Sequence, residues 1–320
     1  MDRWNGVLKI QLHPNSSTFY RVAASLGLSS PKNLAVPFGN AILFTGDRVE
    51  GTGNPVIERL SDPQTIAEIL VSKFGGSVNA FVVEASEFNG SFAVYKDFIP
   101  TVNEYGEPKS YDATGFPAST SLVLLLSRFL AEAKNIILGK QKEAYLYEAS
   151  PSSFSCKPKT ALLGFSKGGT VLNQLITEFA FSEIQSTQIP SQLIKKEDDS
   201  FIPTSKEGLF ESISEIHYVD VGLNVEGAYL TDKDAIDRIS ARISQRESGI
   251  FRFLFHGTPR QWRDERRIWI RKEKDTLVRL LKKTAHTNMG KLHLCERLYF
   301  PRKNPDLQMH FEIIDVMDVS

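Results

Sequence analysis

Short apolar runs alternate with longer amphipathic segments along most of this chain. The apolar runs have the length of strands and lie at residues 4–12, 40–45, 78–83, 213–221, 250–255 and 292–300. Apolar residues at helical spacing predict helices over residues 63–74, 118–138, 231–244 and 274–283. Because strands and helices follow one another in turn, we expect an α/β fold, with a mostly parallel central sheet and helices on both faces.

Residues 160–179, TALLGFSKGGTVLNQLITEF, join a predicted strand to a predicted helix through a glycine-rich turn. The turn contains G-x-S-x-G, with Gly164 and Gly168 two residues on either side of Ser166. In this setting the pattern is typical of a nucleophile elbow, so the expected fold is α/β-hydrolase-like. Two rival interpretations are a plain turn that caps a helix and a phosphate-binding loop. A P-loop lysine follows its glycines, whereas Lys167 precedes them.

A serine nucleophile needs a base, which is usually histidine, and a further group that fixes the tautomer of that base. In α/β-hydrolases the chain order is nucleophile, acid, histidine. This order excludes His13 and favours His310, which follows the last predicted strand and a loop. His256 closes a predicted strand and is the second choice, while His217 lies within a strand and is interpreted as a core residue.

The acid has two candidates. Asp264 is the first carboxylate after the turn that follows the strand at residues 250–255, and it is slightly favoured over Asp220 at the end of the preceding strand. The oxyanion hole is expected from the backbone N–H of Lys167 and from one near Gly46 or Asp47, in the loop after an early strand. A plain turn is the alternative for that loop.

The composition is ordinary for a soluble globular protein, with 41% hydrophobic and 24% charged residues. The formal net charge of zero provides no overall attraction for nucleic acid or an anionic membrane. Only two cysteines, Cys156 and Cys295, favour a reducing intracellular compartment. No apolar run reaches the length of a membrane span, and the N-terminus lacks a signal-peptide pattern. His286 and His293 have no third ligand nearby, so we expect no metal and no cofactor.

Residues 1–320 are interpreted as one domain with a surface insertion. The insertion, residues 186–205, is polar and lacks periodicity, and a lid is the less favoured interpretation. Residues 260–274 are rich in arginine, but carboxylates at ion-pair spacing favour a salt-bridged face over a nucleic-acid site. The aromatic residues between 88 and 111 either line a substrate mouth or pack a loop onto the body.

Four strings in the chain resemble a known family: GFSKGGTVLNQL, VDVGLNVEGAYLTD, HGTPRQWRDERRIWI and LQMHFEII. The family is named for human chromosome 2 open reading frame 69, and the similarity covers most of the chain from Gly46 onward. Its members are regarded as α/β-hydrolase-like and esterase-related, without an established substrate, and are associated with mitochondria in animals. The resemblance implies the fold, the candidates Ser166 and His310, and a cytoplasmic or mitochondrial location.

These observations favour a serine hydrolase of the esterase, thioesterase or lipase type, acting on an acyl ester or lipid-like substrate. The main alternative is a catalytically inactive member of the fold that binds a protein partner. Nucleic-acid binding through residues 260–274 is a distant third, because the chain has no net charge.

Overall fold

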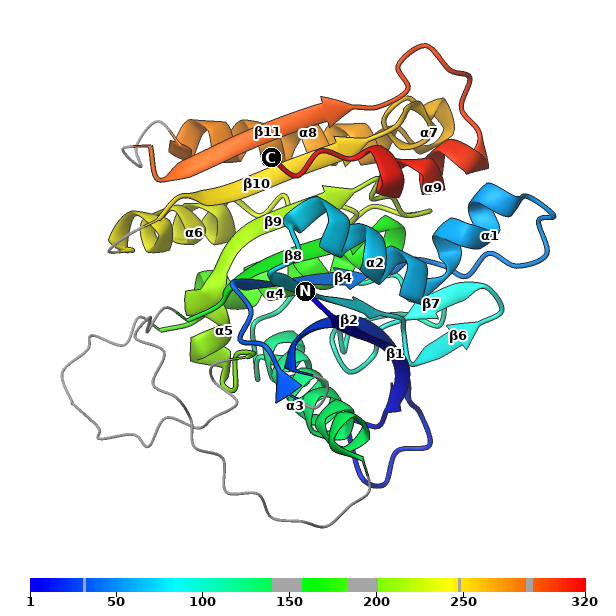
Figure 1. Cartoon of the computed structure of the whole chain (residues 1–320). Coiled ribbons are helices and arrows are strands. Elements are labelled where there is room, and N and C mark those ends of the chain that lie inside the picture. The colour runs from blue at the N-terminus through cyan, green and yellow to red at the C-terminus, as the bar shows by residue number, and fades with distance from the viewer. Residues whose placement is uncertain (31–32, 140–156, 184–200, 247–248, 286–289) are drawn as a thin grey trace.

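The computed structural model describes residues 1–30, 33–139, 157–183, 201–246, 249–285 and 290–320. In these residues the chain forms a central sheet with the strand order β1-β2-β5-β4-β8-β9-β10-β11, and the short β3 pairs with β2 (Figure 1). The strands are β1 (Arg3–Ile10), β2 (Tyr20–Ser30), β3 (Asn33–Leu34), β4 (Gly39–Phe44), β5 (Val78–Val83), β8 (Lys159–Phe165), β9 (Ile213–Val219), β10 (Phe251–Gly257) and β11 (Leu292–Leu298).

Most of this sheet is parallel. Neighbouring strands are parallel throughout the stretch β5-β4-β8-β9-β10-β11 of the sheet. The strand β2 is antiparallel to both β1 and β5. Every residue of β4 and β5 is buried, as expected for strands that are covered on both faces. The carboxyl ends of the parallel strands therefore meet at one edge, where ligands bind in open α/β sheets.

Helices cover both faces of the sheet. The helices α1 (Pro55–Ser61), α2 (Pro63–Phe74) and α9 (Leu307–Val316) share a core with one face, and Figure 1 shows them in front of the sheet. On the other face lie α3 (Pro117–Leu138), α4 (Gly169–Phe181), α5 (Lys206–Ser212), α6 (Lys233–Gln245) and α8 (Ile268–Ala285). Successive residues of β4 belong to different cores: Ile42 and Phe44 pack on the α3–α4 side, whereas Ala41 and Leu43 pack on the α2–α9 side. The chain therefore has the expected α/β-hydrolase-like architecture.

Most predicted elements are present. The helix at residues 63–74 and the strand at residues 78–83 have the predicted bounds. Several elements were not predicted: β2, α1, the hairpin of β6 (Glu87–Asn89) and β7 (Phe92–Val94), the short α7 (Pro259–Trp262) and the helical continuation α9. None of the helices in the described ranges has both the length and the apolar character that crossing a bilayer requires.

The predicted surface insertion at residues 186–205 lies mainly outside the described residues, which resume at residue 201. The interpretation as an insertion stays a prediction, but the described end of the segment is not entirely at the surface. Phe201 and Ile202 are buried against the α3 side of the core. Ser205 then caps α5, because its hydroxyl accepts a hydrogen bond from the N–H of Gly208 at 3.0 Å.

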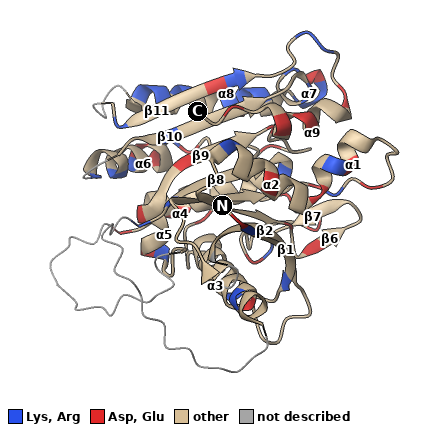
Figure 2. Ribbon diagram, viewed as in Figure 1, with Lys and Arg blue, Asp and Glu red and all other residues tan. Residues whose placement is uncertain are grey.

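The predicted salt-bridged face at residues 260–274 is present only in part. Asp264 pairs with Arg267 at 2.8 Å, and Arg271 pairs with Asp275. Glu273 instead turns inward, where its carboxylate accepts hydrogen bonds from the N–H groups of Gly227 and Tyr229. Figure 2 shows several lysine and arginine residues on α8.

Candidate active site

Ser166 lies at a sharp bend between β8 and α4. Its φ of 53° is in the left-handed region, which non-glycine residues adopt rarely and often at functional sites. Gly168 makes the bend possible, because a Cβ atom there would lie 2.1 Å from the carbonyl oxygen of Phe44. The bend thus brings the Ser166 side chain to the carboxyl edge of the sheet, where it is half-buried.

Gly46, in the loop after β4, contacts this bend directly. A Cβ atom at Gly46 would lie 2.4 Å from Ser166 Cβ, 2.8 Å from Ser166 Oγ and 3.1 Å from the backbone nitrogen of Lys167. A side chain is therefore excluded at this position. The backbone of the β4 loop (residues 45–48) lies against both the serine hydroxyl and the N–H group at the start of the following helical turn.

His310 is the fourth residue of α9. The helix is fixed at its start by Asp306, whose carboxylate accepts the N–H of Met309 at 2.7 Å. The imidazole ring packs on Phe165, the residue before Ser166, with ring centroids 4.6 Å apart. The sequence placed His310 after a loop and predicted no helix there. The structure places it on a helix, beside the residue that precedes the bend.

Asp220 is the carboxylate that contacts His310. The distance from Asp220 Oδ2 to His310 Nδ1 is 2.6 Å. Thr258 also binds this carboxylate, because its N–H donates to Oδ1 at 2.7 Å and its hydroxyl donates to Oδ2 at 2.9 Å. A carboxylate only accepts hydrogen bonds, so His310 carries its proton on Nδ1 and presents Nε2 as an acceptor.

Asp264, the slightly favoured acid in the sequence, lies elsewhere. It caps a short 3₁₀ turn, accepting hydrogen bonds from the N–H of Arg266 at 3.0 Å and from Arg267 Nε at 2.8 Å. Burial alone would raise the pKa of Asp264, but these two arginine residues hold the pKa below its ordinary value. The structure therefore brings together His310 and Asp220, and the preference for Asp264 has no support in the geometry.

Two further histidines form a buried stack that no sequence pattern indicated. His217 on β9 and His256 on β10 have parallel rings, and His217 Nδ1 lies 3.2 Å from His256 Nε2. The Glu215 carboxylate accepts a hydrogen bond from His217 Nε2 at 3.0 Å, so the ring proton of His217 is on Nε2. His217 Nδ1 then accepts a hydrogen bond from His256 Nε2. His256 Nδ1 in turn lies 3.1 Å from the hydroxyl of Tyr299, which donates to it. All these groups are satisfied with both imidazoles neutral, and burial lowers the pKa of His217 and of His256.

Because these two pKa values are lowered in the folded state, we expect stability to fall in mild acid. Below about pH 6.5 the unfolded chain binds protons that the folded chain does not, so the free energy of unfolding decreases as the pH falls. The expected slope is up to about 1.4 kcal/mol per pH unit for each histidine. Urea denaturation between about pH 7.5 and about pH 5.5 measures it.

The substitutions His217→Asn and His256→Gln should each flatten this dependence, whereas His293→Gln, at an exposed position of β11, should leave it unchanged. Equal slopes in all four proteins would show that the buried pair is not the cause.

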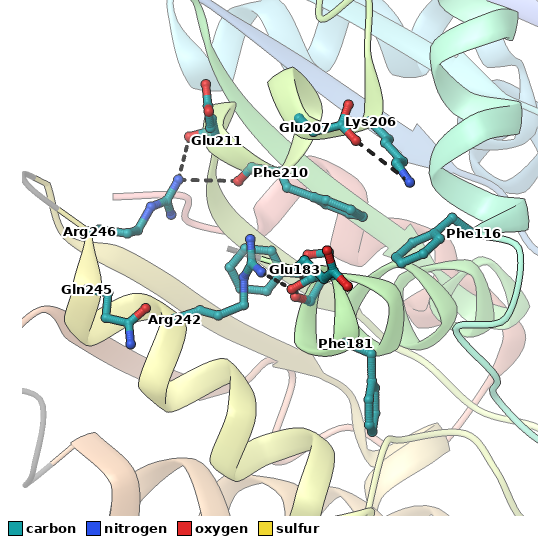
Figure 3. Close-up of a pocket in the computed structure, with 12 residues that line it drawn as sticks. Phe116, Phe181, Glu183, Lys206, Glu207, Phe210, Glu211, Arg242, Gln245 and Arg246 are labelled. Carbon is teal, nitrogen blue, oxygen red and sulfur yellow. Dashed lines mark hydrogen bonds and ion pairs between the residues drawn. The ribbon is translucent and has the colours of Figure 1, made fainter. Parts of the chain in front are cut away.

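A separate hollow of about 530 Å³ lies between α4, α5 and α6 (Figure 3). Its walls include Phe179 and Phe210, together with Arg242 and Arg246. The arginine residues donate to carbonyl groups at helix ends: Arg242 to Ser182, and Arg246 to Phe210 and Glu211. Ser166 precedes the start of α4 whereas Phe179 is near its end, about 20 Å away along a helix of this length. The hollow is therefore not part of the site at Ser166.

Within the described residues, no cluster of three or more His, Cys, Asp or Glu side chains is arranged to hold a metal ion. Cys295 is a free, partly buried thiol on β11. Cys156 and His286 lie outside the described residues.

Comparisons with known proteins agree with the resemblance found in the sequence. A family model of C2orf69 matches residues 139–287. A mouse protein named mitochondrial protein C2orf69 homolog is 23% identical over 287 residues, which cover 79% of this chain and 69% of the mouse protein. The resemblance to this family is therefore confirmed.

Among solved structures, the chain is similar to the siderophore hydrolase EstA from Aspergillus nidulans, with 12% identity and a TM-score of 0.48 over 96% of this chain and 91% of that one. It is also similar to an S-formylglutathione hydrolase from Agrobacterium tumefaciens, with 10% identity and a TM-score of 0.40 over 98% and 92% of the two chains. At identities this low, the roles of individual residues have to be argued from this chain alone.

Proposed function

We propose that this relative of the C2orf69 family is a serine hydrolase that cleaves acyl esters. The observation that carries the proposal is the Asp220–His310 pair, which lies against Phe165, the residue before Ser166. A buried carboxylate fixes one nitrogen of an imidazole at 2.6 Å, and that ring packs on the residue before a serine held in a left-handed bend. In this interpretation the bend is a nucleophile elbow.

In the proposed reaction, Ser166 Oγ attacks the carbonyl carbon of the ester while His310 Nε2 takes the hydroxyl proton. Asp220, held by Thr258, stabilises the imidazolium that forms. The tetrahedral intermediate expels the alcohol, which receives the proton from His310, and leaves an acyl group on Ser166. A water molecule, deprotonated by His310, then releases the carboxylic acid and restores the serine.

The oxyanion of both tetrahedral intermediates needs hydrogen-bond donors. We assign this role to the backbone N–H of Lys167 and to an N–H of the β4 loop at Gly46 or Asp47. Support comes from the close contact of Gly46 with both Ser166 Oγ and the nitrogen of Lys167. The side chains of Lys167 and Asp47 take no part in this step.

A fluorophosphonate probe tests the proposal, because it reacts with activated serine hydroxyls and loses fluoride. We expect the wild-type chain to be labelled, the label to map to the peptide that contains Ser166, and Ser166→Ala to be unlabelled. Ser182→Ala, at the other end of α4, is the matched control and should be labelled like the wild type. A folded wild-type chain that resists the probe would favour the alternative, an inactive hydrolase fold that binds a protein partner.

A further inference from the structure

Lys167 is buried although it follows the half-buried Ser166, and its side chain is only 4% exposed. Lysine is almost never buried without a charged partner. Here the ammonium group donates to Asp47 Oδ1 at 2.7 Å and to the carbonyl oxygen of Tyr105 at 2.7 Å. It also lies 4.7 Å from the centre of the Phe92 ring, within the range of a cation–π contact.

These contacts join three segments that are distant in the sequence. Asp47 belongs to the β4 loop, Phe92 begins β7, and Tyr105 lies in the aromatic segment that follows. The same Asp47 oxygen accepts the N–H of Ala93 at 2.8 Å, and the N–H of Arg48 donates to the carbonyl of Ser91 at 2.8 Å. The β4 loop is thus bound to the β6–β7 hairpin, which lies outside the central sheet (Figure 1).

The Lys167–Asp47 pair is also close to the groups that contact the reacting atoms. Lys167 follows Ser166, and Asp47 follows Gly46, where a Cβ atom would lie 2.8 Å from Ser166 Oγ. A shift of the β4 loop would therefore change the distance between its N–H groups and the serine. Catalysis is sensitive to such shifts, because a displacement of about 1 Å can reduce the rate about 100-fold.

The pair also fixes an apolar wall. The rings of Phe92 and Tyr105 meet edge to face at 5.4 Å, and Tyr105 is 44% exposed. Both residues are bound by the Lys167 ammonium group, Phe92 through its ring and Tyr105 through its carbonyl. This aromatic pair, which we call the Phe92–Tyr105 wall, consequently has a fixed position next to the Lys167 ammonium group.

We infer that the Lys167–Asp47 pair is a positioning device. It holds the β4 loop, which carries a proposed oxyanion donor, against Ser166, and it holds the Phe92–Tyr105 wall beside that loop. This inference rests on the proposed function and deepens it. Lys167 acts through Asp47 and Tyr105, and it does not touch the reacting atoms with its side chain.

The substitution Lys167→Met tests this role, because methionine keeps most of the apolar stem and removes the charge. Lys274→Met is the matched control. Lys274 is 5% exposed, pairs with Asp275 at 2.6 Å and with Glu296, and lies 4.5 Å from the Trp262 ring. Each substitution removes the ammonium partner of a carboxylate, Asp47 in one case and Glu296 in the other, so both variants should lose stability.

With p-nitrophenyl butyrate as substrate, Lys167→Met should lower kcat about 10- to 100-fold and change KM less than about 3-fold. Asp47→Asn should have a similar effect, and the double variant should be no worse than the single variants. Lys274→Met should keep the wild-type kcat. Equal kcat values in Lys167→Met and Lys274→Met would overturn the inference.

A second measurement does not depend on activity. In Lys167→Met, the backbone amides of Asp47, Arg48 and Ala93 should exchange hydrogen faster than in the wild type, whereas Lys274→Met should not affect them. If the wild type neither hydrolyses the ester nor reacts with the probe, the proposed function fails and the exchange data alone decide whether the pair holds the loop. Unchanged exchange in Lys167→Met would then refute the inference as well.

Discussion

Replacing His310 with alanine is expected to lower kcat/KM for ester hydrolysis by about 10⁴- to 10⁶-fold. In the proposed mechanism the imidazole takes the proton of Ser166, and no other histidine contacts Asp220 among the described residues. Ser166→Ala should have an effect of the same size. Because the two groups act as a unit, the double variant should be no less active than either single variant. Initial rates with p-nitrophenyl butyrate measure all three.

His293→Ala, at an exposed position of β11, is the control and should keep wild-type activity. Thermal unfolding of His310→Ala separates loss of chemistry from loss of structure, since the ring also packs on Phe165 and Phe311. A folded His310→Ala variant with wild-type activity would transfer the role of base to another group. Additive losses in the double variant would show that Ser166 and His310 do not act together.

The sequence predicted the frame of the fold because apolar periodicity depends on nearby residues. The runs that became β4 and β5 are apolar throughout, and α3 has its apolar side chains on one face. The same local pattern located Ser166, since only closely spaced glycine residues allow a chain to turn so sharply from a strand into a helix.

The elements that were missed have weaker local patterns. β2 (YRVAASLGLSS) lies between β1 and β5 and contains mostly small residues, and its buried alanines give no strong apolar signal. α9 has only ten residues and follows a polar loop, so the sequence LQMHFEIIDV did not stand out as a helix. Its position over the sheet depends on packing of Phe311 and Ile314 against the α2 side of the core.

Pairing between distant side chains could not be predicted, because it depends on strand register. Chain order left two carboxylates open, with Asp264 after β10 slightly favoured over Asp220, and the contact with His310 comes from Asp220 at the end of β9. The two strands are neighbours, and Asp220 has a left-handed φ of 44° that turns its carboxylate toward Thr258, just beyond the end of β10. The Lys167–Asp47 pair likewise exists because β4 and β8 are adjacent in the sheet.

Asp220→Asn is expected to lower kcat about 10⁴-fold and to leave the fold intact. The reason lies in Thr258, whose N–H donates to Oδ1 of the native carboxylate. In the variant this donor favours the asparagine oxygen at that position, so the amide NH₂ group faces His310 Nδ1. An NH₂ group only donates hydrogen bonds, so His310 Nδ1 has to accept and the ring proton moves to Nε2. A protonated Nε2 cannot accept the proton of Ser166.

The comparison with Asp264→Asn makes this prediction decisive, because both variants replace a carboxylate by an amide of the same shape. Asp264 caps a 3₁₀ turn and pairs with Arg267, so its substitution should cost about 1 kcal/mol of stability or less and change kcat less than about 3-fold. Steady-state rates and urea denaturation of the two variants measure both effects. A large loss of kcat in Asp264→Asn together with wild-type kcat in Asp220→Asn would reverse the assignment of the acid.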